Sequence, residues 1–154
     1  MNDHESTPSR EELLQQIHAI ALVTTSVANG DLTREIEFEA TGEMLELKKT
    51  INTMMDQLNL FAYELTRLSR DLGSHGVLGG QMEVGGITGT WKDLIDNVNY
   101  MANSLTVQVR SLSDTVQAVN AGDTSRRITV EAQGEMKELR DAINILIERS
   151  SRTT

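Results

Sequence analysis

The sequence predicts an all-α protein built from repeated two-helix units that associate along narrow apolar seams. Three observations lead to this prediction. A segment recurs without a gap, and apolar residues recur at alternating steps of three and four, which is the spacing of one helix face. The chain also has only one Trp, two Tyr and two Phe among 154 residues, so Leu, Ile, Val and Met must do the packing.

The repeat joins residues 27–58 to residues 119–150 at a constant offset of 92. The positions shared by the two copies are Gly30 and Gly122, Asp31 and Asp123, Ile36 and Ile128, Gly42 and Gly134, Glu43 and Glu135, Met44 and Met136, Leu47 and Leu139, Ile51 and Ile143, and Asn52 and Asn144. A more divergent copy lies between them, where Gly89, Leu94, Val98 and Asn99 repeat Gly42, Leu47, Ile51 and Asn52. The chain therefore reads as three copies of a unit of roughly 46 residues.

The first unit begins with a helical stripe over residues 13–27, downstream of Pro8, a residue that suits a helix start. Gly30 suits a left-handed residue after the helix end. Apolar and acidic residues then alternate from Leu32 to Phe38, which predicts an extended connector. Thr41, Gly42 and Glu43 open the second helix.

The second helix carries an uninterrupted heptad seam from residue 44 to residue 72. Its members are Met44, Leu47, Ile51, Met54, Leu58, Phe61, Leu65, Leu68 and Leu72. No Gly or Pro interrupts it, so the last helix of the first unit also serves as the first helix of the second unit. We interpret the cluster Met44, Met54 and Met55 as core packing.

A connector from Gly73 to Gly89 holds seven of the 11 glycines, and a helical pattern resumes from Trp91 to Val119. Two successive steps of four around Leu105 shift the phase of this seam. Met136, Leu139, Ile143 and Leu146 close the third unit. We divide the chain into a polar segment 1–12, units 13–58, 59–105 and 106–150, and a polar tail 151–154.

Two helices per unit would leave their seams half exposed, and a second copy of the chain would supply the missing pair. A connector of about 9–12 extended residues, at roughly 3.3 Å each, can span a helix of about 22 Å and return to its start. The two helices of a unit can therefore run parallel.

The connector residues Gly30-Asp31-Leu32 with Ile36, followed by Gly42-Glu43-Met44, Leu47 and Ile51-Asn52, resemble the HAMP signalling module. The runs at 51–58, 78–81 and 89–94 resemble the tandem HAMP arrays of fungal group III hybrid histidine kinases and similar bacterial poly-HAMP proteins. The resemblance covers residues 13 to 150. It implies three consecutive modules, each a parallel four-helix coiled-coil bundle formed by a homodimer, joined by continuous helices.

The resemblance also implies which residues matter structurally and for signalling. Two hydrophobic residues of each connector would plug the bundle, namely Leu32 and Ile36, Leu78 and Met82, and Thr124 and Ile128. Thr124 departs from the apolar pattern. Glu43 and Glu135 would open the second helices, where the middle unit has Thr90. The remaining marked positions are Gly30, Gly42, Gly89, Gly122, Gly134 and Trp91, the last expected as a large seam residue at a helix start.

Composition argues against several other functions. The net charge of −9 disfavours nucleic acid and polybasic membrane binding, because both need a basic surface. No apolar run approaches the roughly 20 residues of a membrane span, the N-terminus is not a secretory signal, and cysteine is absent. We expect a cytoplasmic chain, on the cytoplasmic side of the membrane if its parent is a membrane receptor.

No catalytic, cofactor-binding or metal-binding group is expected. The glycine-rich connector lacks the Lys-Ser/Thr pair of a phosphate-binding loop, and His18 and His75 are isolated. His4 beside Glu5 lies outside any helical stripe, which disfavours a phosphoacceptor role. No small-molecule ligand is expected, and the expected partners are a second copy of the chain and sensor kinase or receptor domains.

Two functions stay open at this point. The chain can be a relay that transmits conformational change between an input and an output domain of a two-component sensor-type protein. The alternative is a passive coiled-coil dimerisation spacer or scaffold. The seams include Thr24, Thr115, Met54 and Met101, residues typical of an imperfect coiled coil. Any histidine kinase activity would belong to a parent or partner protein, and the chain can be a fragment or a complete small protein.

Overall fold

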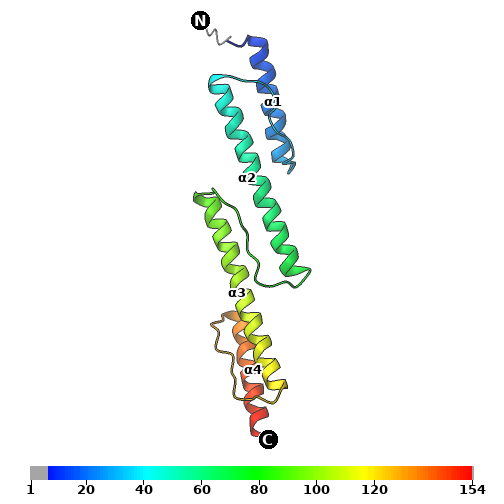
Figure 1. Ribbon diagram of the computed structural model, residues 1–154, viewed down its shortest axis with the longest axis vertical. Helices are drawn as coiled ribbons and strands as arrows, with labels where there is room; N and C mark the ends of the chain where they lie inside the picture. The colour runs from blue at the N-terminus through cyan, green and yellow to red at the C-terminus, as the bar shows by residue number, and fades with distance from the viewer. Residues whose placement is uncertain (1–6, 154) are drawn as a thin grey trace. The chain divides into compact units, whose positions relative to one another are not determined.

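The computed structural model describes residues 7–153, and His4 lies outside them. Four helices make up this part of the chain, with no strand among the described residues: α1 (Arg10–Ala28), α2 (Gly42–Gly73), α3 (Gly89–Asn120) and α4 (Gly134–Arg152). The all-α prediction is confirmed (Figure 1). As expected, α2 and α3 are each a single helix of 32 residues.

Helix α1 begins earlier than the apolar stripe. Ser9 caps it, because the Ser9 hydroxyl accepts from the Glu12 backbone N–H at 3.1 Å. The Glu12 carboxylate in turn accepts from the Ser9 N–H at 3.2 Å. This reciprocal pair is a capping box, and it places residues 10–12 in the helix rather than in a separate polar segment.

The described chain forms two compact units. The first contains α1 and α2 up to Arg67, together with Val84–Ile87. Within it, α1 and α2 run in the same direction, and the connector 29–41 returns along them (Figure 1). The core consists of Val23 from α1, Ile36 from the connector, and Ile51 and Met55 from α2. Ile20, Val27, Leu32 and Phe38 pack against it half-buried.

The second unit contains Leu68–Glu83 and the chain from Thr88 onward. Helices α3 and α4 run in the same direction, and the connector 121–133 returns from the end of α3 to the start of α4 (Figure 1). Its buried residues are Leu68, Met82, Ile95, Ala102, Thr106, Thr115, Ile128, Ala132 and Ile147.

The predicted heptad seam is not buried as a whole within the single chain. On α2, Met55 is fully buried, whereas its neighbour Met54 is 41% exposed. Leu47 is 43% exposed, while Ile51 and Leu68 are buried. The helix therefore carries two apolar edges, one packed against its own connector and one left open.

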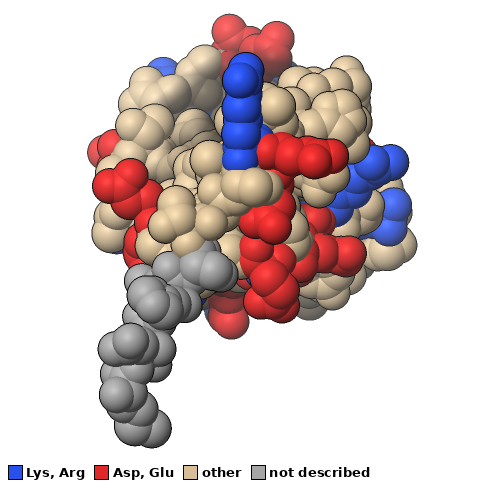
Figure 2. Space-filling model, turned by 90° about the horizontal axis from the view of Figure 1, so that it is seen from above, with Lys and Arg blue, Asp and Glu red and all other residues tan. Residues whose placement is uncertain are grey.

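No helix within residues 7–153 combines the length and the apolar character that a membrane crossing requires. Acidic side chains extend across the face of the molecule that Figure 2 displays, with basic side chains beside them. This distribution agrees with the net charge of −9.

Candidate functional site: the connector clamps

Each connector is held to the following helix by an asparagine side chain. The Asn52 side-chain oxygen accepts from the Ile36 N–H at 2.9 Å, and its amide nitrogen donates to the Ile36 carbonyl at 3.0 Å. Asn99 makes the same two bonds to Met82, at 2.7 and 3.1 Å. Asn144 makes them to Ile128, at 2.8 and 3.0 Å. We call these three arrangements the connector clamps.

The clamped residue points its own side chain into the core. Ile36, Met82 and Ile128 are 2%, 3% and 5% exposed. The clamp solves a specific problem, because an extended segment that buries its side chain also removes its backbone from water, and buried polar groups need partners. A side-chain amide has one acceptor and a donor, like a peptide group, so one asparagine satisfies both.

The helix positions around the plug repeat as well. The first helix of each unit supplies Val23, Leu68 or Thr115, and all three are buried. The second helix supplies Met55, Ala102 or Ile147, which are buried too. Three elements thus contribute one buried residue each to every clamp, and Thr115 brings a polar hydroxyl where the first clamp has Val23.

The first plug residue of each connector is less buried than the second. Leu32, Leu78 and Thr124 are all half-buried. Each is fixed through its carbonyl oxygen. The donors are Asn59 Nδ2 at 2.6 Å, Arg110 Nη2 at 3.3 Å and Arg127 Nη1 at 2.8 Å, respectively.

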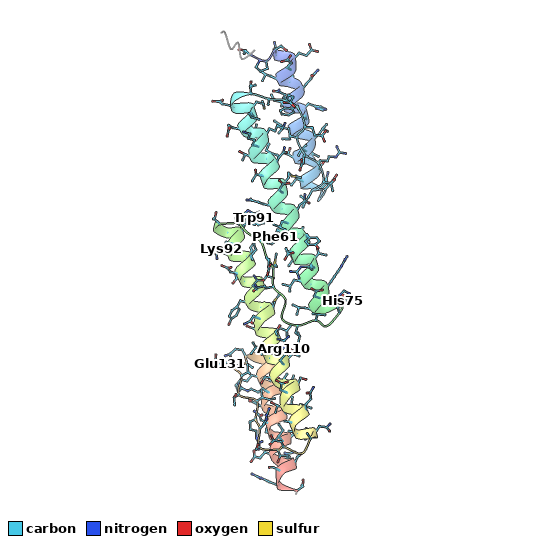
Figure 3. The ribbon with its side chains drawn as sticks, in the orientation of Figure 1. Phe61, His75, Trp91, Lys92, Arg110 and Glu131 are labelled. Atoms are coloured by element: carbon cyan, nitrogen blue, oxygen red, sulfur yellow. The ribbon has the colours of Figure 1, made fainter. Side chains whose placement is uncertain are left out.

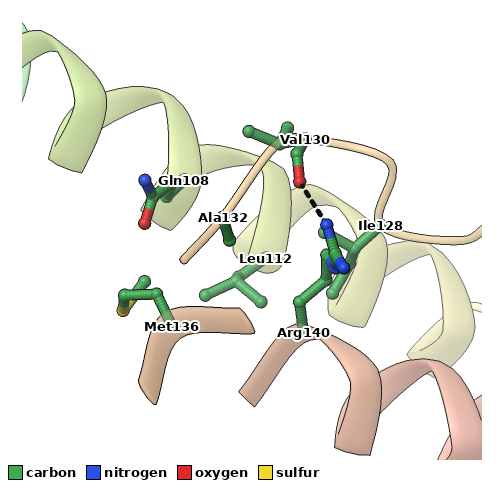
Figure 4. Close-up of a pocket in the computed structure, with 7 residues that line it drawn as sticks. All are labelled: Gln108, Leu112, Ile128, Val130, Ala132, Met136 and Arg140. Carbon is green, nitrogen blue, oxygen red and sulfur yellow. Dashed lines mark hydrogen bonds between the residues drawn. The ribbon is translucent and has the colours of Figure 1, made fainter. Parts of the chain in front are cut away.

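A basic side chain supports the outer two clamps. Lys48 Nζ donates to the Phe38 carbonyl at 2.8 Å, and Arg140 Nη1 donates to the Val130 carbonyl at 3.1 Å. Figure 4 shows Arg140 reaching that carbonyl beside a small pocket lined by apolar side chains such as Met136. In the middle unit the corresponding residue is Ile95, which is 6% exposed, so a buried hydrocarbon replaces the cation there.

The five glycines singled out in the sequence all adopt positive φ. Gly30 and Gly122 follow the ends of α1 and α3, with φ of +83° and +99°. Gly42, Gly89 and Gly134 open α2, α3 and α4, with φ between +55° and +64°. A Cβ added at any of the five would meet nothing within 4 Å. The backbone conformation alone therefore explains the preference for glycine at these places.

Two of the three units carry an acidic residue at the start of their second helix. Glu43 and Glu135 lie in the first turns of α2 and α4, both exposed, where a carboxylate is favoured by the helix dipole. The first turn of α3 carries no acidic residue. Trp91 lies beside Thr90 at that helix start and is 45% exposed, so it is not buried as a seam residue within one chain (Figure 3).

Two aspartates cap the chain just after α1 and α3. Asp31 accepts from the Thr33 hydroxyl at 2.6 Å and from its N–H at 3.0 Å. Asp123 does the same with Ser125. These hydrogen bonds stabilise the charged carboxylates, so they lower the pKa of Asp31 and of Asp123 below the ordinary 3.8.

One apolar pair of each second helix remains open. The pairs are Leu47 with Met54, Leu94 with Met101, and Leu139 with Leu146, and their six side chains are between 41% and 63% exposed. We call these residues the open stripe. These residues recur at the same positions in all three units, on an edge different from the clamped one. They therefore form a repeated apolar surface and not isolated exposed side chains.

The described residues contain no group of three or more His, Cys, Asp or Glu that could hold a metal ion. His18 and His75 are exposed, and His75 Nδ1 lies 3.7 Å from Asp71 Oδ1 (Figure 3). The site consists of buried plug residues, asparagine amides that are hydrogen-bonded to the backbone, and an open apolar edge. Such an arrangement is suited to packing between helices.

Asn52, Asn99 and Asn144 align in the sequence repeat, but the sequence pattern indicates no role for them. The available signal was a mid-helix asparagine at the same place in all three copies, since asparagine is a mediocre helix former. Ile36, Met82 and Ile128, which the resemblance marks as plug residues, are all buried.

Comparison with protein families gives two matches. Residues 12–60 match a family model described as HAMP domain, and residues 86–151 match a second model with the same description. The first match contains the Asn52 clamp, and the second contains Asn99 and the whole Asn144 clamp.

Proposed function

The chain belongs to the HAMP domain family, whose members are signal-relay linkers of sensor proteins, and on this premise we propose how it works. It relays a conformational change along a parallel homodimer, between an input domain and an output domain of a sensor-type protein. It carries no catalytic step of its own. Kinase activity belongs to a parent or partner protein, and the relay operates in the cytoplasm.

The open stripe is the observation that supports the homodimer. Six large apolar side chains at equivalent positions are left between 41% and 63% exposed by the single chain. A second copy related by a two-fold axis parallel to the helices presents the same stripe to the first. Burying this stripe between two copies stabilises the dimer by about 25 cal/mol per Å² of apolar surface, and it requires no change to the clamps.

We assign the relay three modules, residues 13–58, 59–105 and 106–150. The three clamps support this division, because each module contains one clamped plug residue, its asparagine, and an equivalent buried residue from each of its two helices. Helix α3 supplies both Asn99 of the middle clamp and Thr115 of the third. A rotation of α3 would therefore move residues of two clamps, in the middle and the third module.

A relay also needs two packings of similar free energy. The buried set of α3 suits this requirement, because Ala102, Thr106 and Thr115 are small or polar where Met55 and Leu68 are large and apolar. Small and polar residues bury less hydrocarbon than leucine does. A core that contains them therefore stabilises any single packing arrangement less strongly than a uniform leucine core would.

Cross-linking tests the dimer directly, because the chain has no cysteine. Met54→Cys places a thiol on the open stripe, and a short bis-maleimide should join two copies at this position. Asp56→Cys is the matched control, since Asp56 is exposed but lies about 200° away around the same helix. Equal cross-linking of both variants, or none at Met54→Cys, would contradict the proposed interface.

A second experiment separates a relay from a passive spacer. A spin label at Leu146→Cys reports the distance between the two copies in the third module. Ile36→Asp disrupts the plug of the first module, because it buries a charge in place of a 2% exposed isoleucine. A relay changes the distance distribution at position 146, whereas a spacer leaves it unchanged. Asn52→Ala repeats the test with a milder lesion of the same clamp.

A further inference from the structure

We propose that Thr129, in the connector between α3 and α4, is a phosphorylation site for a basophilic serine/threonine kinase. The Thr129 hydroxyl attacks the γ-phosphorus of ATP, the bond from that phosphorus to the β,γ-bridging oxygen breaks, and ADP leaves. The hydroxyl proton passes to the base of the kinase. The proposal does not depend on whether the chain relays a signal.

The residues before Thr129 fit the acidic substrate groove of such a kinase. Arg126 and Arg127 stand three and two residues before it, and all three side chains are exposed. The segment is a connector without helix or strand, so it can be extended in a kinase groove. A pair of arginines is suited to binding the carboxylates of such a groove, because each guanidinium can donate two parallel N–H hydrogen bonds to one carboxylate.

The repeat gives an independent reason to expect negative charge at this place. The residue after the clamped plug is Glu37 in the first connector and Glu83 in the second, and both are exposed. Only the third connector has an uncharged residue there, Thr129. Phosphorylation adds a charge of about −1.5 to −2, so it gives the third connector the sign that the other two carry permanently.

The modified residue would have local cationic partners. Side chains alternate along an extended segment, so Arg127 and Thr129 lie on the same side, opposite the buried Ile128. The Arg126 side chain is 62% exposed, and its Nε lies 3.5 Å from an Asp123 carboxylate oxygen. A phosphate at Thr129 would compete with the Thr124 carbonyl for Arg127, whose Nη1 donates to that carbonyl at 2.8 Å, whereas Arg126 would give up only its exposed ion pair with Asp123.

The clamp should control access to Thr129. A kinase groove must accommodate the residues around the acceptor, but Ile128 is 5% exposed and its backbone is bonded to Asn144 on both sides. The kinase therefore modifies the released connector faster than the clamped one. Phosphorylation of Thr129 then records how often the third clamp opens.

The test uses the complete purified chain, ATP and the catalytic subunit of cyclic-AMP-dependent protein kinase as the basophilic probe. Mass spectrometry should place phosphate on Thr129, and Asn144→Ala should raise the initial rate severalfold. Thr129→Ala should remove the signal in both backgrounds. Ser113 is an internal control, because Arg110 precedes it by three residues but the site lies within helix α3.

A synthetic peptide of residues 122–134 gives the rate without a clamp. Absence of phosphate at Thr129 in both the wild type and Asn144→Ala would overturn the proposal, whether or not the peptide is modified. Phosphorylation of Ser113 as fast as Thr129 would also overturn it. Equal rates in the wild type and Asn144→Ala would contradict control by the clamp.

Discussion

Asparagine is the residue best suited to the clamp. Its amide donates and accepts within one short side chain, which is what the N–H and C=O of a single plug residue require. Aspartate at neutral pH would keep the acceptor and lose the donor. Serine or alanine would leave at least one backbone group of a buried segment without its partner.

Asn99→Ala should therefore lower the free energy of unfolding by about 1–3 kcal/mol, because it leaves the Met82 N–H and C=O without their partner. Asn97→Ala is the control, since Asn97 is exposed and lies two residues away on the same helix. Urea unfolding followed by circular dichroism compares the two variants. Equal midpoints would mean that the clamp contributes nothing to stability.

At the scale of elements, the helix starts depend on glycine for backbone reasons alone. Gly42→Ala should destabilise the protein by about 1–2 kcal/mol, because φ at this residue is +60° and the left-handed region is unfavourable for L-residues. Gly73→Ala, at the end of α2, should be neutral or stabilising, since its φ is not positive and a Cβ there meets nothing within 4 Å. Thermal unfolding measures both, and a Gly42→Ala variant as stable as the wild type would refute the argument.

The caps after α1 and α3 respond to acid. The pKa of Asp31 is lowered, chiefly by the Thr33 hydroxyl, so its contribution to stability is present above pH 3.8 and is lost as the pH falls through the lower folded value. NMR titration of the Asp31 carboxyl should give a midpoint below 3.8. Thr33→Val should move that midpoint upward, and an unchanged midpoint would exclude the hydroxyl as the cause.

The helices could be predicted from the sequence, because the periodicity of apolar residues encodes them, whereas the plug residues are implied by the resemblance to the HAMP module and not by the pattern itself. The early start of α1 could also have been found, since Ser9 and Glu12 form the S-x-x-E pattern of a capping box. Which residues of the α2 seam are buried within the chain, and which are left exposed, could not be predicted from the sequence. Met54 and Met55 are neighbours of one residue type, and only the return path of the connector decides that Met55 is buried.

At the scale of the whole molecule, charge opposes the proposed association. Each chain carries a net charge of −9, so two copies repel each other while their open stripes attract. Added salt shortens the Debye length from about 10 Å at 0.1 M to about 3 Å at 1 M. The dissociation constant of the dimer, measured by light scattering over a concentration series, should therefore fall as NaCl rises. A constant that increases with salt would indicate that cross-chain ion pairs dominate.

The sharing of α3 between two clamps restricts how the gene can change in length. One residue inserted between Asn99 and Thr115 would turn one clamp by about 100° relative to the other, so one of the two plugs would lose its site. A residue inserted in a connector costs little more than loop entropy. The middle repeat bears this out, because Gly76 follows Gly30 by 46 residues whereas Gly89 follows Gly42 by 47. Insertions and deletions should therefore accumulate in connectors. A helix should change in length only by steps that keep the angle between its two clamps.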